Sequence, residues 1–223
     1  MSDTTLTPNH DPALAHHFND LEQQHEAATL GMWAFLAQEV LFFGGVFTAY
    51  AVYRHRFPEA FHEASQHLDI VLGTINTTAL LTSSLTMALA VQAAQWGRQK
   101  ATFWFIFLTF LLGMVFMGIK VVEYSDKFAH HLVPGPNFNA GTHSAAVDPH
   151  NIQLFFSFYF VMTGLHALHM IIGVAILLWI MLGVPRGKWM GPRATFIEMT
   201  GLYWHLVDLV WIFLFPLLYL IGR

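Results

Sequence analysis

The amino-acid sequence predicts an all-α integral membrane protein, a bundle of five transmembrane helices. The first observation is composition: 55% of the 223 residues are hydrophobic and 11% are charged, against about 25% charged residues in typical soluble domains. The mean hydropathy of +0.49 agrees with this, because so few charges cannot coat a water-facing globule. The second observation is five apolar segments, each longer than the roughly 20 residues that span a hydrocarbon core of about 30 Å.

The chain divides into a polar tail and a transmembrane domain. Residues 1–27 contain no Lys or Arg, whereas a signal peptide needs a basic start, so we expect a retained tail. Residues 28–223 hold the five predicted helices, at about 31–53, 70–92, 102–122, 152–182 and 196–221. The first contains a single charge, the second is rich in Thr and Ser, the third is rich in Phe and Leu, and the last two carry His, Glu and Asp.

The connections complete the predicted topology. Residues 125–151 form the longest one, and their Pro, Gly and Asn content predicts an ordered surface loop without helix. Five helices place the two termini on opposite sides of the membrane. Each side has five basic residues: Arg98, Lys100, Arg186, Lys188 and Arg193 on the N-terminal side, and Arg54, Arg56, Lys120, Lys127 and Arg223 on the other. Because the first set lies in short connections close to helix ends, we expect a cytoplasmic N-terminus and a periplasmic C-terminus.

Ionisable residues inside the predicted helices are the candidate site residues, because each costs about 2.5–3.5 kcal/mol at the centre of a membrane helix. Glu39 is either a proton-exchanging carboxylate or a protonated packing residue. His166 and His169 are three apart and share a helix face. Glu198, His205 and Asp208 form one stripe, flanked by Trp204 and Trp211 at a spacing of seven. Lipid would leave such a stripe without hydrogen bonds, so it must face protein.

Three interpretations of these residues compete. His169 and His205 could ligate a haem from facing helices. Glu39, Glu123 and Glu198 could build a di-metal site with the histidines, although the Glu-x-x-His spacing of such bundles is missing on the last two helices. Composition and spacing favour the third interpretation, in which the polar groups fix helix packing and docking onto a membrane partner. The absence of Cys excludes thiolate-bound zinc, iron–sulfur clusters and copper centres with thiolate ligands.

Four motifs follow one another along the helices. They are GMWAFLAQEVLFFGG around Glu39, IKVVEY ending in Glu123 and Tyr124, GLHALHMIIG with His166, His169 and Gly173, and YWHLVDLVW with Trp204, His205, Asp208 and Trp211. In this order they resemble subunit III of the haem-copper oxidases, the family of cytochrome c oxidase. Glu198 also falls at an acidic position of that family. The resemblance covers about residues 29–222, and the last two motifs are its most specific part.

The resemblance implies a non-redox auxiliary subunit with no metal of its own. Haem and copper would belong to subunit I, electron entry to subunit II, and this chain would pack on subunit I. There it would stabilise a proton-pumping terminal oxidase of aerobic respiration and sustain its proton uptake, with bound phospholipid as a possible component. The five helices match the short bacterial form of the family, so the resemblance also implies a multi-pass protein of the bacterial cytoplasmic (inner) membrane.

Two departures from the family and two alternative functions accompany this expectation. Seven-helix members hold phospholipid in a cleft between their first two helices and the rest, and this chain alone cannot build that cleft. Lys120 stands where mitochondrial-type relatives carry Gln, so we expect an ion pair with Glu123, three residues further along the same face. The alternatives are the equivalent subunit of a quinol oxidase or nitric oxide reductase, and a haem-bearing membrane anchor.

Overall fold

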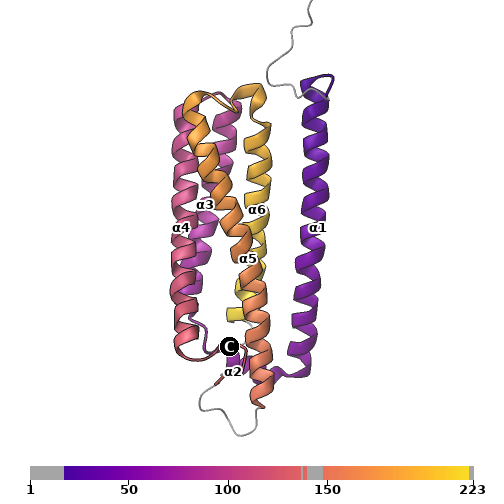
Figure 1. Ribbon diagram of the computed structural model, residues 1–223, viewed down its shortest axis with the longest axis vertical. Coiled ribbons are helices and arrows are strands. Elements are labelled where there is room, and N and C mark those ends of the chain that lie inside the picture. Colours follow the sequence, from indigo (N-terminus) through magenta and orange to yellow (C-terminus); the bar gives the residue numbers. More distant parts are fainter. Residues whose placement is uncertain (1–17, 137, 140–147, 221–223) are drawn as a thin grey trace, which may run out of the picture.

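A computed structural model describes residues 18–136, 138–139 and 148–220, and all regular secondary structure in this part of the chain is helical. Five long helices run up and down along one axis (Figure 1): α1 (Leu21–Arg56), α3 (Ile70–Gln95), α4 (Gln99–Ala129), α5 (Pro149–Gly183) and α6 (Thr195–Phe215). Each is long and apolar enough to cross a membrane. The predicted all-α bundle of five transmembrane helices is therefore confirmed.

Four of the five long helices, α1, α3, α4 and α5, are longer than the apolar segments that predicted them. α1 begins at Leu21, within the predicted tail of residues 1–27, of which residues 1–17 lie outside the described part. Its 36 residues measure about 54 Å at roughly 1.5 Å per residue, so its ends extend beyond the hydrocarbon core. Asp20 starts it by accepting a hydrogen bond from the backbone N–H of Gln23 at 2.7 Å, an N-cap that lies outside the apolar segment that predicted the helix.

The expectation of a loop without helix over residues 125–151 was wrong at both ends. α4 continues to Ala129, and α5 begins at Pro149. Asp148 caps α5 by accepting a hydrogen bond from the N–H of His150 at 2.9 Å, and Pro149 occupies the first turn, where no N–H is needed. Helix formation therefore continues where the chain leaves the apolar layer.

Short helices were also not anticipated. α2 (Pro58–Ser65) follows α1 at the lower end of Figure 1, and the 3₁₀ turns Val184–Arg186 and Gly191–Arg193 connect α5 to α6. α6 continues into the π-helical turn η3 (Pro216–Leu220). Pro216 lacks an N–H and its ring presses on the carbonyl four residues earlier, which explains why the regular α-helix ends there.

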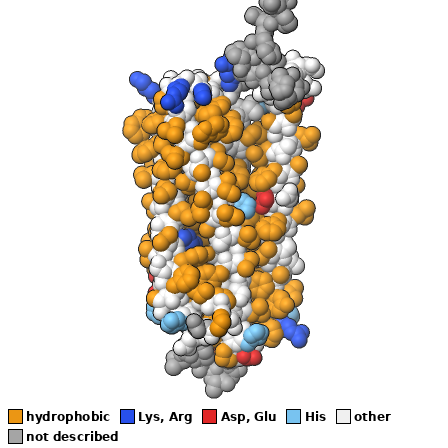
Figure 2. All heavy atoms as spheres, in the orientation of Figure 1, with side chains coloured by type: hydrophobic (Ala, Val, Ile, Leu, Met, Phe, Trp, Pro, Cys, Tyr) orange, Lys and Arg blue, Asp and Glu red, His pale blue; other side chains and the backbone are white. Residues whose placement is uncertain are grey.

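α6 lies at the centre of the bundle. It packs against α3, α5 and α1, while α3 also packs along most of α4 and α5 covers α4 and α6 on another side. In the most apolar 18-residue stretch of each helix, 56% of α6 is buried within the chain but only 11% of α1. α1 therefore leaves most of its surface to lipid or to another protein, and hydrophobic side chains cover the sides of the bundle in Figure 2.

Small residues allow the helices to approach α6 closely. The indole of Trp204, which is fully buried, lies between Gly113 of α4 and Gly173 of α5. A Cβ atom on either glycine would come within 2.9 Å of the indole ring. The glycines thus form the slot that accepts this large side chain.

Candidate functional site: polar groups inside the bundle

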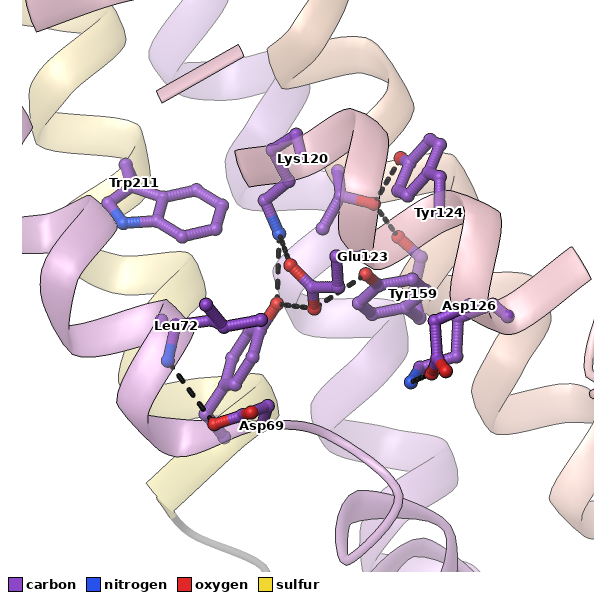
Figure 3. A network of polar contacts seen from close by, with 12 residues as sticks. Asp69, Leu72, Lys120, Glu123, Tyr124, Asp126, Tyr159 and Trp211 are labelled. Atoms are coloured by element: carbon purple, nitrogen blue, oxygen red, sulfur yellow. Dashed lines mark hydrogen bonds and ion pairs between the residues drawn. The ribbon is translucent and has the colours of Figure 1, made fainter. Parts of the chain in front are cut away.

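An ion pair on α4 forms the centre of a buried polar network (Figure 3). Lys120 and Glu123 are 4% and 2% exposed, and Lys120 Nζ lies 2.7 Å from Glu123 Oε2. The sequence predicted this pair from the i, i+3 spacing, and the structure confirms it.

Aromatic side chains from two other helical segments complete the network (Figure 3). Tyr159 of α5 donates a hydrogen bond to Glu123 Oε1 at 2.9 Å, and Tyr219 of η3 donates to the same oxygen. Lys120 also donates to the Tyr219 hydroxyl at 2.9 Å, and its Nζ lies 4.5 Å from the ring centroid of Trp211. Both carboxylate oxygens and the ammonium therefore have partners, and the network has no net charge. Sequence reasoning missed both tyrosines because they lie far from Glu123 in the chain.

A second pair joins α1 to α5. Glu39 Oε2 lies 3.3 Å from His169 Nε2, without the alignment of a hydrogen bond. His169 Nδ1 lies 2.8 Å from the carbonyl oxygen of Leu165, and a carbonyl only accepts, so Nδ1 carries a proton. Glu39 Oε2 and His169 Nε2 then attract each other only if one of them carries a further proton, because two unprotonated acceptors would repel. The predicted candidates Glu39 and His169 are thus brought together.

His166 faces a different helix from His169. Its Nε2 lies 3.1 Å from the carbonyl oxygen of Val207 on α6, and its ring packs against Phe116 and Trp211 at centroid distances of 5.3 and 5.2 Å. The ring is 1% exposed, and Nδ1 has no hydrogen-bond partner among the described residues. The two histidines predicted on one face therefore serve two helix contacts.

Hydroxyl groups of α3 meet the predicted polar residues of α6. The indole N–H groups of Trp204 and Trp211 donate to Ser83 and Thr77, each at 3.1 Å, and His205 Nδ1 lies 2.7 Å from Ser84 Oγ. The sequence signal for these contacts is the Thr- and Ser-rich composition of α3, which supplies the hydroxyl groups.

Asp208 and Asn76 lie buried without completed hydrogen bonds. Asp208 is 2% exposed and faces Ser83 and Ser84, but neither carboxylate oxygen makes a well-formed hydrogen bond within the described chain. Asn76 of α3 is 0% exposed, and both Oδ1 and Nδ2 of its side chain lack a hydrogen-bond partner within the described chain. The buried surfaces of α3 and α6 therefore retain unused hydrogen-bonding capacity.

Glu198 does not belong to an interior stripe with His205 and Asp208, contrary to the sequence interpretation. It lies in the first turn of α6, where Gln95 of α3 donates to Glu198 Oε1 at 2.8 Å. His25 of α1 lies 4.0 Å away, and the Glu198 side chain is 22% exposed. Glu198 therefore connects α1, α3 and α6 at the end of the bundle. It does not reach His205 and Asp208, because the seven residues from Glu198 to His205 span about 10 Å along the helix.

The arrangement is suited to helix packing rather than to redox chemistry. His169 and His205 do not form the facing haem ligands of the alternative interpretation, because His169 contacts α1 and His205 contacts α3. Glu39, Glu123 and Glu198 lie in three separate contacts, and the described residues contain no group of three or more His, Asp or Glu placed to hold a metal ion.

A basic pocket lies at the end of the bundle where α1 begins. It has a volume of about 530 Å³ and is lined by Arg186, Lys188, Arg193, His25, Trp189 and Phe196, among others. Basic side chains gather at this upper end in Figure 2. Basic residues together with Trp are typical of the region where a membrane protein meets lipid headgroups.

Comparison with known proteins identifies the family. The family model for cytochrome c oxidase subunit III matches residues 15–223. The chain is 30% identical over 212 residues to "Probable quinol oxidase subunit 3" of Staphylococcus saprophyticus, covering 94% of this chain and 98% of the relative. It is 28% identical over 215 residues to the protein of the same name from Staphylococcus aureus strain USA300, with the same coverage. The chain therefore belongs to the cytochrome c oxidase subunit III family of the haem-copper oxidases.

Proposed function

We propose that this chain is the auxiliary subunit that stabilises a proton-pumping terminal oxidase by packing against its catalytic subunit I. The observation that carries the proposal is the network around Glu123, in which three helical segments satisfy every charge internally. Such an interior forms a rigid membrane scaffold and leaves oxygen reduction to the haem and copper of the partner subunits.

The test is removal and return of the chain. A tagged chain purified from native membranes should bring a haem-containing oxidase with it. The oxidase from which the chain has been stripped should start turnover at the normal rate, lose activity during sustained turnover, and recover its lifetime when the chain is added back. Purification of the tagged chain without any haem protein would overturn the proposal.

The electron donor is either a quinol or cytochrome c. The names of the relatives favour a quinol oxidase, while the family as a whole is named for cytochrome c oxidase. Both donors would deliver electrons to another subunit, so the scaffold role is the same in each. Oxygen consumption by the purified complex with a reduced quinol, compared with reduced cytochrome c, separates the two activities.

We also propose a cytoplasmic N-terminus in a bacterial inner membrane. The sequence divided the basic residues equally, but Lys120 lies inside the bundle on Glu123 and so does not flank a span. Four basic residues of that side then flank the spans, against five at the N-terminal end, which supports the N-terminal end as cytoplasmic. A membrane-impermeant maleimide should label Glu59→Cys but not Lys188→Cys in spheroplasts with an intact inner membrane. The chain has no native cysteine to interfere, and the reverse labelling would contradict this orientation.

The basic pocket is proposed as the place where an anionic phospholipid headgroup binds. Its three cations can contact a phosphate, and Trp189 and Phe196 can contact the upper acyl chains. Mass spectrometry of the purified complex should find less retained phosphatidylglycerol in an Arg186→Gln/Lys188→Gln variant than in the wild type. Equal retention would contradict the lipid assignment.

A further inference from the structure

The outward faces of the helices differ in polarity. Between residues 102 and 122 of α4 and between residues 152 and 182 of α5, every exposed residue is apolar or glycine. In the most apolar 18-residue stretch of each helix, 33% of α3 and 33% of α5 is buried within the chain. The mean hydropathy is nevertheless lower in α3, at 1.3, than in α5, at 2.5. Buried polar residues such as Asn76 and Ser83 contribute to the lower hydropathy of α3, but α3 also exposes polar side chains between residues 70 and 92, which α4 and α5 do not over the ranges above.

Three threonines account for part of this difference. Thr74, Thr78 and Thr82 are exposed on α3 at a spacing of four. Each hydroxyl donates to the carbonyl oxygen one turn earlier, at 2.8–2.9 Å, so lipid would tolerate them. Their small size also lets another helix approach α3 closely.

His205 of α6 is the group that lipid would not satisfy. It is the eleventh residue of the 26-residue span Thr195–Leu220, about 15 Å from the start of that span and near the middle of the membrane. The imidazole is half-buried, and Nδ1 is occupied by Ser84. Nε2 has no partner within the described chain, and a polar atom left in hydrocarbon costs several kcal/mol.

The surroundings of His205 point to a partner outside the chain. Ser84, which holds Nδ1, also faces the buried carboxylate of Asp208, so the nearby polar groups lie on the inner side of the imidazole. On its outer side, Leu209 is one turn away and 46% exposed. Another helix would have to supply the polar contact to Nε2.

We propose that the α3–α6 outer face, defined by Thr74, Thr78, Thr82, His205 and Leu209, docks a transmembrane helix of the catalytic oxidase subunit. That helix carries a hydrogen-bonding side chain opposite His205 Nε2. This inference rests on the proposed function and adds which face makes the contact: α3–α6 is the protein-facing side, and the outer faces of α4 and α5 contact lipid.

Photo-crosslinking in native membranes tests the assignment. A benzoylphenylalanine is placed at Leu209, or at the matched control position Leu168 on α5, which is 53% exposed. The Leu209 probe should give an adduct with another oxidase subunit, and the Leu168 probe should give none. An adduct at twice the mass of this chain, or a subunit adduct only from Leu168, would overturn the proposal.

A pair of substitutions separates His205 from its internal contact. His205→Leu should reduce the oxidase that co-purifies with the tagged chain, whereas Ser84→Ala, which removes the internal partner of Nδ1 and leaves Nε2 in place, should retain it. Equal retention in both variants would overturn the role of Nε2. If the wild-type chain brings no haem protein, the proposed function itself fails. If it does and Leu209 gives no subunit adduct, only the docking face is wrong.

Discussion

Removing the Glu123 carboxylate should destabilise the bundle more than any surface substitution on α4. In Glu123→Leu, the Lys120 ammonium keeps the Tyr219 hydroxyl but loses its counter-charge, and Tyr159 and Tyr219 lose the oxygen to which both donate. The replacement side chain is apolar, so it accepts none of these donors. The result is a cation held at a 4% exposed position without compensation.

The expected loss in the free energy of unfolding is about 3–5 kcal/mol, the range found when one partner of a buried ion pair is removed. The double variant Lys120→Met/Glu123→Leu removes the charge as well, and it shares with Glu123→Leu the loss of the oxygen to which both tyrosines donate. It should therefore recover the share of the loss that comes from the uncompensated buried cation. Ser125→Ala is the matched control, because it removes from an exposed position of the same helix only a hydroxyl that donates to the Val121 carbonyl one turn earlier. Its cost should stay below about 1 kcal/mol.

The assay is unfolding of the detergent-purified chain by increasing fractions of sodium dodecyl sulfate, followed by far-ultraviolet circular dichroism. The wild type, both single variants and the double variant are compared at the same detergent concentration. A Glu123→Leu midpoint equal to that of Ser125→Ala would refute the reasoning. A double variant less stable than Glu123→Leu would show that the isolated cation is not the source of the loss.

Two further predictions address packing and proton exchange. Gly173→Ala should lower the stability of the bundle by about 1–3 kcal/mol through overpacking, because the new Cβ would lie 2.9 Å from the Trp204 ring, while Gly118→Ala, with open space around it, should be neutral in the same unfolding assay. Glu39→Gln should retain the wild-type number of protons pumped per electron in reconstituted vesicles, because an amide N–H can donate to His169 Nε2 as a protonated carboxyl would. Glu39→Ala should weaken the contact of α1 and shorten the active lifetime of the complex.

Each of these has a clear contrary outcome. Stability unchanged by Gly173→Ala would mean that the Trp204 slot is wider than the structure shows. A fall in protons per electron in an intact Glu39→Gln complex would make Glu39 a working proton-exchange group.

The sequence correctly predicted the features that depend on the residues of one helix alone. The five spans followed from the lengths of the apolar segments, and the Lys120–Glu123 pair followed from a three-residue spacing on one face. Helix ends were predicted poorly because the apolar content marks only the part inside the hydrocarbon. The N-caps at Asp20 and Asp148 set the observed starts of α1 and α5 instead.

Contacts between helices were beyond the reach of the sequence. It supplied Glu39, His169, His205 and Glu198 as candidates, but grouped Glu198 with His205 and left the partners of the others open. The structure pairs Glu39 with His169, and Ser84 with His205.

The sequence by itself determined that this protein is a five-helix membrane bundle, its family, and which ionisable residues lie within the spans. Only the tertiary structure decided which of these residues meet, and which outward face remains polar. The physical reason is that a membrane helix is apolar on nearly every side, so the pattern of hydrophobic residues does not specify how the helix is rotated about its axis. Rotation and register are set by small residues, aromatic slots and hydrogen bonds between helices, such as Trp204 between Gly113 and Gly173.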